Sequence, residues 1–174
     1  LPERSDKFVF KLAPYLTLEP AFLAFAIIPL GGDFRDGKGG MVTMFGHQTR
    51  LQLADPPIGV LFALAISSIA VYGIMLAGWS SGSKYPLLGS VRASAQMVSY
   101  EAALGLSVCA VVLVSGTLST HDMVMAQAGQ GWLGFIPHWN IIAAGIVPFI
   151  VFLLASQAEL NRPPFDLVEA EQEL

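Results

Sequence analysis

The chain has 174 residues, of which 54% are hydrophobic and only 13% are charged. Soluble domains typically contain about 25% charged residues, so the composition excludes an ordinary soluble domain and is typical of a membrane protein. The net charge of −4 argues against nucleic acid as a partner.

Four apolar stretches are long enough to cross a membrane as helices, because a hydrocarbon core about 30 Å thick needs about 20 helical residues. They cover about 12–31, 58–79, 92–118 and 140–159. Prolines inside these stretches predict kinks. We therefore predict an all-α polytopic membrane protein with kinked transmembrane helices, which forms a single membrane domain over 1–174.

The first span contains Pro14, Pro20 and Pro29, which predict a kinked or locally unwound helix. Glu19 lies well inside this span. An ionisable group at that depth is costly and indicates a functional site, although snorkelling or a hydrogen bond to a neighbour explains it equally well. The following segment, 32–57, contains two glycine pairs and predicts a loop with one short hairpin.

The second span carries small residues at four-residue intervals, namely Gly59, Ala63 and Ser67. Such a stripe lets helices approach closely, so we expect this face to pack against another helix. Asp55 precedes the span, and its simplest role is that of a helix cap. The next segment, 80–91, is predicted to be a short loop.

The third span has polar side chains on two faces in its first turns. Its two stripes are Arg92, Gln96 and Tyr100 on one face, and Ser94, Met97 and Glu101 on the other. Because polar side chains on both faces cannot all be exposed to lipid, we expect this part of the helix to be enclosed by protein or by a hydrated cavity.

The last span follows a polar loop over 119–139, is predicted to kink at Pro148, and leads into an acidic segment over 160–174. Its Pro-Pro pair stops the helix at Arg162. Asp166 and Glu169 have the spacing of a capping box, which predicts that a surface helix starts there. A capped, solvated acidic helix is one interpretation of the segment, and a functional set of acids is the other.

The alternation of four spans places 1–11, 80–92 and 157–174 on one side of the membrane, and 32–57 and 119–139 on the other. The first side holds six of the nine basic residues. The positive-inside rule therefore predicts that this side faces the cytoplasm, or the matrix in an organelle. Glu101 and the acidic segment both fall toward this inner side.

Glu101, Glu159 and the acids of the terminal segment form a set of carboxylates at graded depth. Burial and like-charged neighbours disfavour the charged form of a carboxyl group, which lets it carry a proton near working pH. Arg92 and Arg162 stabilise the charged forms instead. The set can relay protons or form a static ion-pair network, and spacing does not separate the two.

The cysteine count bounds the redox chemistry. The single cysteine, Cys109, excludes an internal disulfide, and it excludes an iron–sulfur cluster held by this chain alone, since such a cluster needs about four cysteine ligands. The three histidines show no metal-ligand spacing, so no metal site is predicted. The sequence starts without Met and ends in a charged segment, so we expect a piece of a longer chain.

Two stretches carry a specific resemblance to a known family. They are YGIMLAGWSSGSKYPLLGSVRASAQMVSYEAALGLS over 72–107 and AELNRPPFDLVEAEQEL over 158–174. Both resemble signature regions of the membrane subunit of respiratory complex I, the NADH-quinone oxidoreductase, that helps form the quinone site. This family comprises the bacterial H subunit and the first mitochondrially encoded subunit of animals. LADPPIGVLF over 53–62 is similar more loosely. The resemblance implies about eight spans, so this chain is a partial one.

The resemblance implies a subunit of a proton-pumping enzyme that links quinone reduction to proton translocation through buried carboxylates. The implied proton-relay residues are Glu101, Glu159, Asp166, Glu169, Glu171 and Tyr100. Residues implied to balance charge or line the quinone cavity are Arg92, Arg162, Gln96, Lys84, Asp55 and Phe165. Gly82 and the Pro56-Pro57 pair depart from the family pattern, but they lie outside the acidic motif.

The same resemblance implies quinone, either ubiquinone or menaquinone, as the substrate, and no covalently bound cofactor. The iron–sulfur clusters and the flavin then belong to partner subunits. The implied partners are peripheral iron–sulfur and quinone-site subunits, adjacent membrane subunits and the lipid bilayer. The implied location is the bacterial inner membrane, or the mitochondrial inner membrane in an organelle.

Three other functions stay open. A related proton-coupled membrane hydrogenase has a similar membrane subunit that need not bind quinone. A secondary transporter with broken helices around Glu19 and Glu101 is the second, although the spans show no internal repeat. The third is a passive membrane anchor for peripheral enzymes.

Overall fold

The computed structural model describes residues 5–32, 34, 39–128, 138–160, 163 and 165. These residues are mostly helical, and a two-stranded sheet is the exception. The elements are α1 (Lys7–Ala26), β1 (Met41–Met44), β2 (His47–Arg50), α2 (Gly59–Ser80), α3 (Lys84–Ser115), α4 (Thr120–Gln127), α5 (Asn140–Ala143) and α6 (Ile146–Glu159). In the described part of the chain, α1, α2 and α3 are long and apolar enough to cross a membrane. The predicted helical membrane fold is confirmed.

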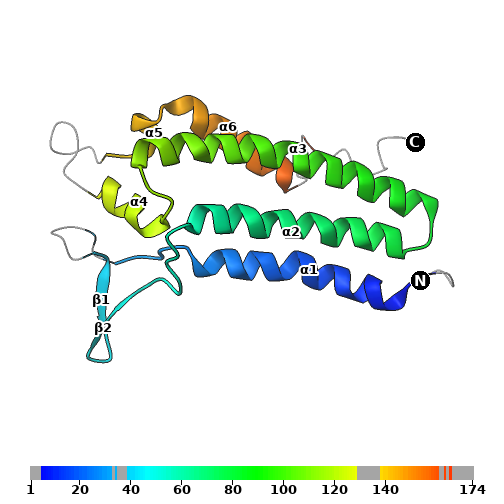
Figure 1. Cartoon of the computed structure of the whole chain (residues 1–174), viewed down its shortest axis with the longest axis horizontal. Helices are drawn as coiled ribbons and strands as arrows, with labels where there is room; N and C mark the ends of the chain where they lie inside the picture. The colour runs from blue at the N-terminus through cyan, green and yellow to red at the C-terminus, as the bar shows by residue number, and fades with distance from the viewer. Residues whose placement is uncertain are drawn as a thin grey trace.

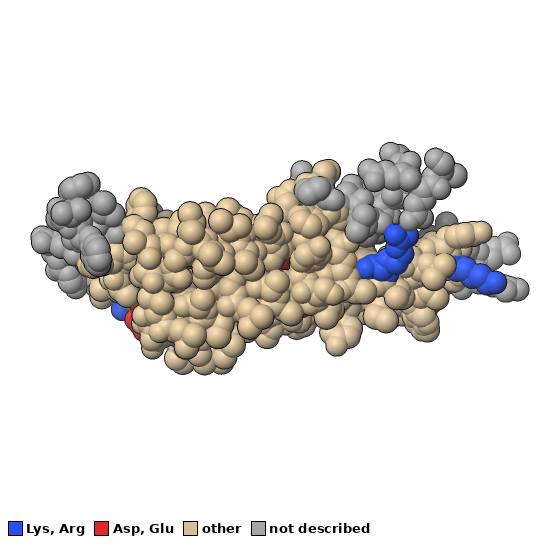
Figure 2. All heavy atoms as spheres, turned by 90° about the horizontal axis from the view of Figure 1, so that it is seen from above, with Lys and Arg blue, Asp and Glu red and all other residues tan. Residues whose placement is uncertain are grey.

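The helices form a row in which α1 packs on α2, α2 on α3, and α3 on α6. Figure 1 shows the start of α1 and the link between α2 and α3 at one end of the row, which we call the turn end, whereas α6 ends partway along α3. The β1–β2 pair, α4 and α5 lie at the opposite, hairpin end. Figure 2 shows a broad middle band of the surface with almost no charged atoms, as expected of a bundle that spans a bilayer.

The hairpin predicted within 32–57 is confirmed. β1 and β2 pair antiparallel, with Met44 opposite His47 and Met41 opposite Arg50. Phe45 and Gly46 form the connecting turn, and both have positive φ, of 51° and 82°. Two central residues with positive φ match the twist of a tight hairpin, which explains the glycine there.

Two predicted loops are shorter in the structure than the sequence suggested. α3 begins at Lys84, so only 81–83 separate it from α2, where a loop over 80–91 was expected. Pro86 does not prevent this, because it lies in the first helical turn, where the backbone N–H groups have no partner within the helix. The loop predicted over 119–139 likewise contains α4, whose N-cap Ser119 accepts a hydrogen bond from the Asp122 N–H at 3.3 Å.

The last predicted span is interrupted, although not where the proline suggested. α5 and α6 are separated at Ala144 and Gly145, and Gly145 has a φ of +91°. Pro148 lies in the first turn of α6, where proline needs no hydrogen-bond partner. The interruption therefore falls three residues before the proline, at the residue that can adopt the left-handed conformation.

Glycines set the close approach of the long helices. A Cβ atom on Gly73 would lie 2.6 Å from Cγ2 of Thr17 and 2.8 Å from the carbonyl oxygen of Ala13, both on α1. A Cβ atom on Gly78 would overlap the Ser90 side chain and lie 2.7 Å from the carbonyl oxygen of Pro86, both on α3. The α2 helix thus contacts its two neighbours through positions that have no side chain.

Candidate functional site

Glu101 lies on the face of α3 that packs against α2, at a half-buried position. Its carboxylate Oε1 accepts a hydrogen bond from Oγ of Ser67 at 3.2 Å, and a second one from Oγ of Ser68. Both serines are consecutive residues of α2. The predicted small-residue stripe therefore does face another helix, and Ser67 contributes a donor as well as a small side chain.

Each of the two serine hydroxyls has a second acceptor within reach. The Leu64 carbonyl oxygen lies 2.9 Å from Oγ of Ser67 and 3.0 Å from Oγ of Ser68. Because a hydroxyl group carries a single proton, each serine can donate either to Leu64 or to the Glu101 carboxylate. The pair can therefore adjust to the protonation state of Glu101 without movement of a helix.

A second carboxylate reaches the same region from α6. Glu159 is the last residue of that helix and is half-buried. Its carboxylate lies near enough to Glu101 for the two negative charges to repel each other. The structure thus brings two predicted relay residues together, from segments 58 positions apart in the sequence (159 − 101 = 58).

The other polar stripe of α3 faces the segment that follows α6. Nε2 of Gln96 donates a hydrogen bond to the carbonyl oxygen of Phe165 at 2.8 Å and lies 3.4 Å from that of Ala158. The Tyr100 ring meets the Phe165 ring edge to face, with centroids 5.3 Å apart. Residues predicted to line a cavity therefore gather beside the carboxylate pair. The predicted enclosure of this face of α3 is confirmed at Gln96 and Tyr100, but not at Arg92, which is exposed.

Asp55 is not part of this group. It lies at the hairpin end, where its carboxylate accepts a hydrogen bond from Oγ of Ser119 at 2.8 Å and forms an ion pair with Arg50 at 3.7 Å. The predicted capping role is wrong, because the N-cap of α2 is Ile58 and no side chain caps that helix. Asp55 instead joins the end of β2 to the start of α4.

The remaining predicted residues lie elsewhere. Lys84 begins α3 at the turn end, and Arg92 is exposed about two turns further along the same helix. Arg162, Asp166, Glu169 and Glu171 lie outside the described residues. The role of Ser68 was not predicted from the sequence. The only feature that pointed to it was its position directly after Ser67, the last residue of the small-residue stripe.

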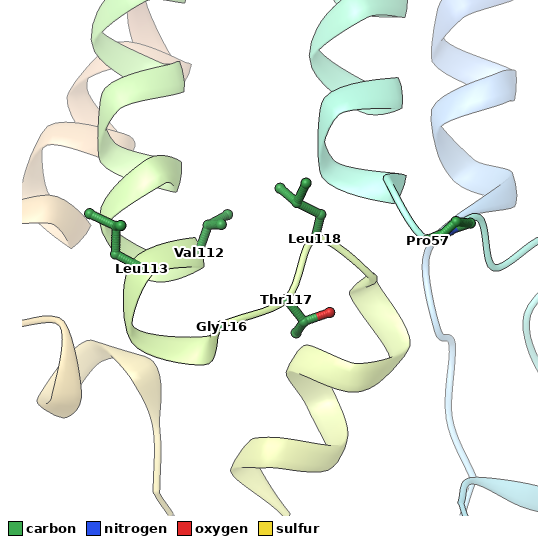
Figure 3. Close-up of a pocket in the computed structure, with 6 residues that line it drawn as sticks. All are labelled: Pro57, Val112, Leu113, Gly116, Thr117 and Leu118. Atoms are coloured by element: carbon green, nitrogen blue, oxygen red, sulfur yellow. The ribbon is translucent and has the colours of Figure 1, made fainter.

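Two cavities lie away from the carboxylates. One, of about 540 Å³, is lined by residues at the end of α3, in the link to α4 and before α2, which Figure 3 shows as sticks. The other, of about 270 Å³, lies between α3 and the α5–α6 segment, and apolar side chains such as Val111 and Phe152 line most of it. Neither lining includes Glu101 or Glu159.

Comparison with known proteins places the chain in a family. A family model described as NADH dehydrogenase matches residues 1–174. Two curated relatives, both named as the H subunit of NADH-quinone oxidoreductase, come from Frankia alni and Frankia casuarinae and are 48% and 47% identical to the chain over 174 residues. Each match covers 100% of this chain and 35% of the relative, so the chain spans about a third of their length.

These matches confirm the resemblance that the two signature stretches carried. The family model extends over the whole sequence, including the first span and the loop at the hairpin end, where the motifs were weak or absent. The chain belongs to the NADH dehydrogenase family, in which its similar relatives are the H subunits of NADH-quinone oxidoreductases.

Proposed function

We propose that this chain is part of the membrane subunit of a proton-translocating NADH:quinone oxidoreductase, where it helps to form the quinone cavity and links quinone reduction to proton transfer. Family membership and the names of the relatives support the enzyme class. The observation that carries the proton-transfer role is Glu101, which two serine hydroxyls hold between α2 and α3. An ionisable group at that depth in a membrane bundle indicates function.

The carboxylate pair gives the proposal a physical mechanism. Because the charges of Glu101 and Glu159 repel, a proton bound by one makes a charge on the other less costly. Reduction of a quinone to a quinol consumes two electrons and two protons. An iron–sulfur cluster of a partner subunit would supply the electrons, and the change of charge at the quinone would shift a proton between the two carboxylates.

The side chains around the pair then have distinct roles. Tyr100 and Gln96 line the polar side of the proposed quinone cavity. They also hold the segment at Phe165 against α3. Asp166, Glu169 and Glu171 extend the relay, and Arg162, Arg92 and Lys84 balance its charge. Asp55 ties the hairpin end together, away from the relay. The proposed location is a bacterial inner membrane.

Purification of the intact complex through this chain tests the enzyme class. The expected result is a complex that contains an iron–sulfur subunit and a flavin, and that oxidises NADH with a soluble quinone. Hydrogen evolution without quinone reduction would identify the hydrogenase alternative. A preparation that lacks iron–sulfur subunits would instead favour the transporter or the anchor.

The serine pair offers a test that leaves the charge of Glu101 in place. The double substitution Ser67→Ala with Ser68→Ala removes both hydroxyl donors, and we expect quinone reductase activity of the assembled complex to fall about tenfold. Ser99→Ala is the matched control, because Oγ of Ser99 donates to its own helix, at the Ala95 carbonyl oxygen 2.8 Å away, and is exposed. Equal activity of the double variant and the control would contradict a role of the hydroxyls.

A further inference from the structure

The chain has few backbone donors where it leaves α6. The helix ends at Glu159, and the sequence continues into the proline pair at 163–164. Proline has no backbone N–H, so neither residue of the pair can extend the helix or donate a hydrogen bond elsewhere. The last four carbonyl groups of a helix also have no partner within that helix. Carbonyl oxygens on both sides of the proline pair therefore need donors from side chains or from water.

Two side-chain amides supply donors at this exit. Nε2 of Gln96, on α3, donates to the carbonyl oxygen of Phe165 at 2.8 Å and lies 3.4 Å from that of Ala158. Nε2 of Gln157, on α6 itself, donates to the carbonyl oxygen of Pro163 at 3.2 Å. Because an amide nitrogen carries two protons, Gln96 can serve both of its carbonyl groups at once. It thereby joins the backbone before the proline pair to the backbone after it.

The surroundings of the two amides give them different weight. Gln157 is exposed, so water can replace its hydrogen bond at little cost. Gln96 is half-buried, and its bonds link residues 62 and 69 positions apart. Tyr100, one turn further along α3, contacts the ring of Phe165 edge to face. Phe165 is thus held by its carbonyl group and by its ring, both from the same face of α3.

The two carbonyl groups next to Gln96 each belong to the residue just before an acid. Glu159 follows Ala158 directly in the sequence, and Asp166 follows Phe165. We propose that Gln96 is a positioning residue, whose amide fixes the backbone on both sides of the proline pair and, with it, the two acids that come next in the sequence. Glutamine is uncharged, so it does this without adding a charge beside the carboxylates. The inference rests on the relay role that the proposed function gives to these acids.

Gln96→Met in the full-length protein, purified as the assembled complex, tests the positioning role. Methionine keeps the length of the side chain but has no N–H donor. By hydrogen exchange and mass spectrometry, we expect the backbone amides of the peptide over 158–165 to exchange about fivefold faster, as for loss of one hydrogen bond, with those of α2 unchanged. The same substitution at Gln48, an exposed position of β2, is the matched control and should leave exchange over 158–165 unchanged.

Steady-state kinetics of the same samples separates positioning from contact with the substrate. Because Gln96 acts through the acids, we expect kcat of quinone reduction to fall about fivefold in Gln96→Met, while KM for the quinone stays at the wild-type value. An increase in KM with kcat unchanged would assign Gln96 to quinone binding instead, and would overturn the inference.

Unchanged exchange over 158–165, or faster exchange with unchanged kcat, also speaks against a positioning role. Gln96→Asn serves if the methionine variant does not assemble, because asparagine keeps the amide but is one methylene shorter, about 1.5 Å, and cannot reach both carbonyl groups. We expect the same two changes in it, and failure of both variants to assemble would make Gln96 a purely structural residue. Exchange needs no quinone turnover, so a wild-type complex that reduces no quinone contradicts the proposed function, whereas an active complex with unchanged exchange in Gln96→Met contradicts only the positioning role.

Discussion

Replacement of Glu101 by glutamine is expected to lower the quinone reductase activity of the assembled complex about a hundredfold, the usual effect of removing a group that transfers a proton. Glutamine keeps the size of the side chain, and its amide oxygen still accepts the hydrogen bonds from Ser67 and Ser68. It cannot bind and release a proton. Steady-state NADH oxidation with a soluble quinone, normalised to the amount of complex, measures the loss.

A carboxylate outside the group provides the control for this substitution. Asp122 lies in the first turn of α4 at the hairpin end, so Asp122→Asn changes one charge without touching the pair. We expect its activity to equal that of the wild type. If Glu101→Gln prevents assembly while Asp122→Asn does not, Glu101 has a structural role, which contradicts the relay.

Gly78→Ala is expected to have the largest effect on assembly. The added Cβ would overlap the Ser90 side chain and lie 2.7 Å from the Pro86 carbonyl oxygen, which is a backbone atom and cannot rotate away. Overpacking of this kind typically costs about 2 kcal/mol. The expected result is a lower thermal unfolding temperature of the purified complex and less complex in the membrane.

Gly89→Ala is the matched control, because Gly89 also lies inside a long helix but a Cβ atom there meets nothing within 4 Å. Alanine is the better helix former by about 1 kcal/mol, so this variant should be as stable as the wild type or slightly more stable. Ser90→Gly in the Gly78→Ala background removes one of the two clashes and should restore part of the loss. Equal stability of the two alanine variants would show that α2 and α3 do not approach as closely as described.

The helices and their order are predictable from the sequence because hydropathy decides them. A run of about 20 apolar residues has few alternatives to a membrane helix, and the loop glycines predicted the hairpin correctly. The polar side chains on two faces of α3 also predicted that both faces have polar partners. The structure supplies them from α2 and from the segment at Phe165.

Details that depend on tertiary contacts were not predictable in the same way. A loop was predicted over 80–91 and a kink at Pro148, but Pro86 and Pro148 each lie in a first helical turn, where proline is tolerated. Asp55 lies shortly before α2, where a capping residue is expected. Only the fold shows that its carboxylate instead accepts a hydrogen bond from Ser119, 64 positions away in the sequence. The approach of Glu159 to Glu101 depends on how α6 packs on α3, which no local pattern encodes.

The central claim is that protons pass through the carboxylates when quinone is reduced. Proton translocation by sealed vesicles that contain the complex tests it most directly, with NADH and quinone as substrates and a pH-sensitive dye as the readout. For Glu101→Gln at wild-type levels of assembled complex, we expect quinone-dependent proton translocation to be lost, while electron transfer from NADH to a water-soluble acceptor that bypasses the quinone remains at the wild-type rate. Proton translocation by Glu101→Gln at the wild-type rate would contradict the relay.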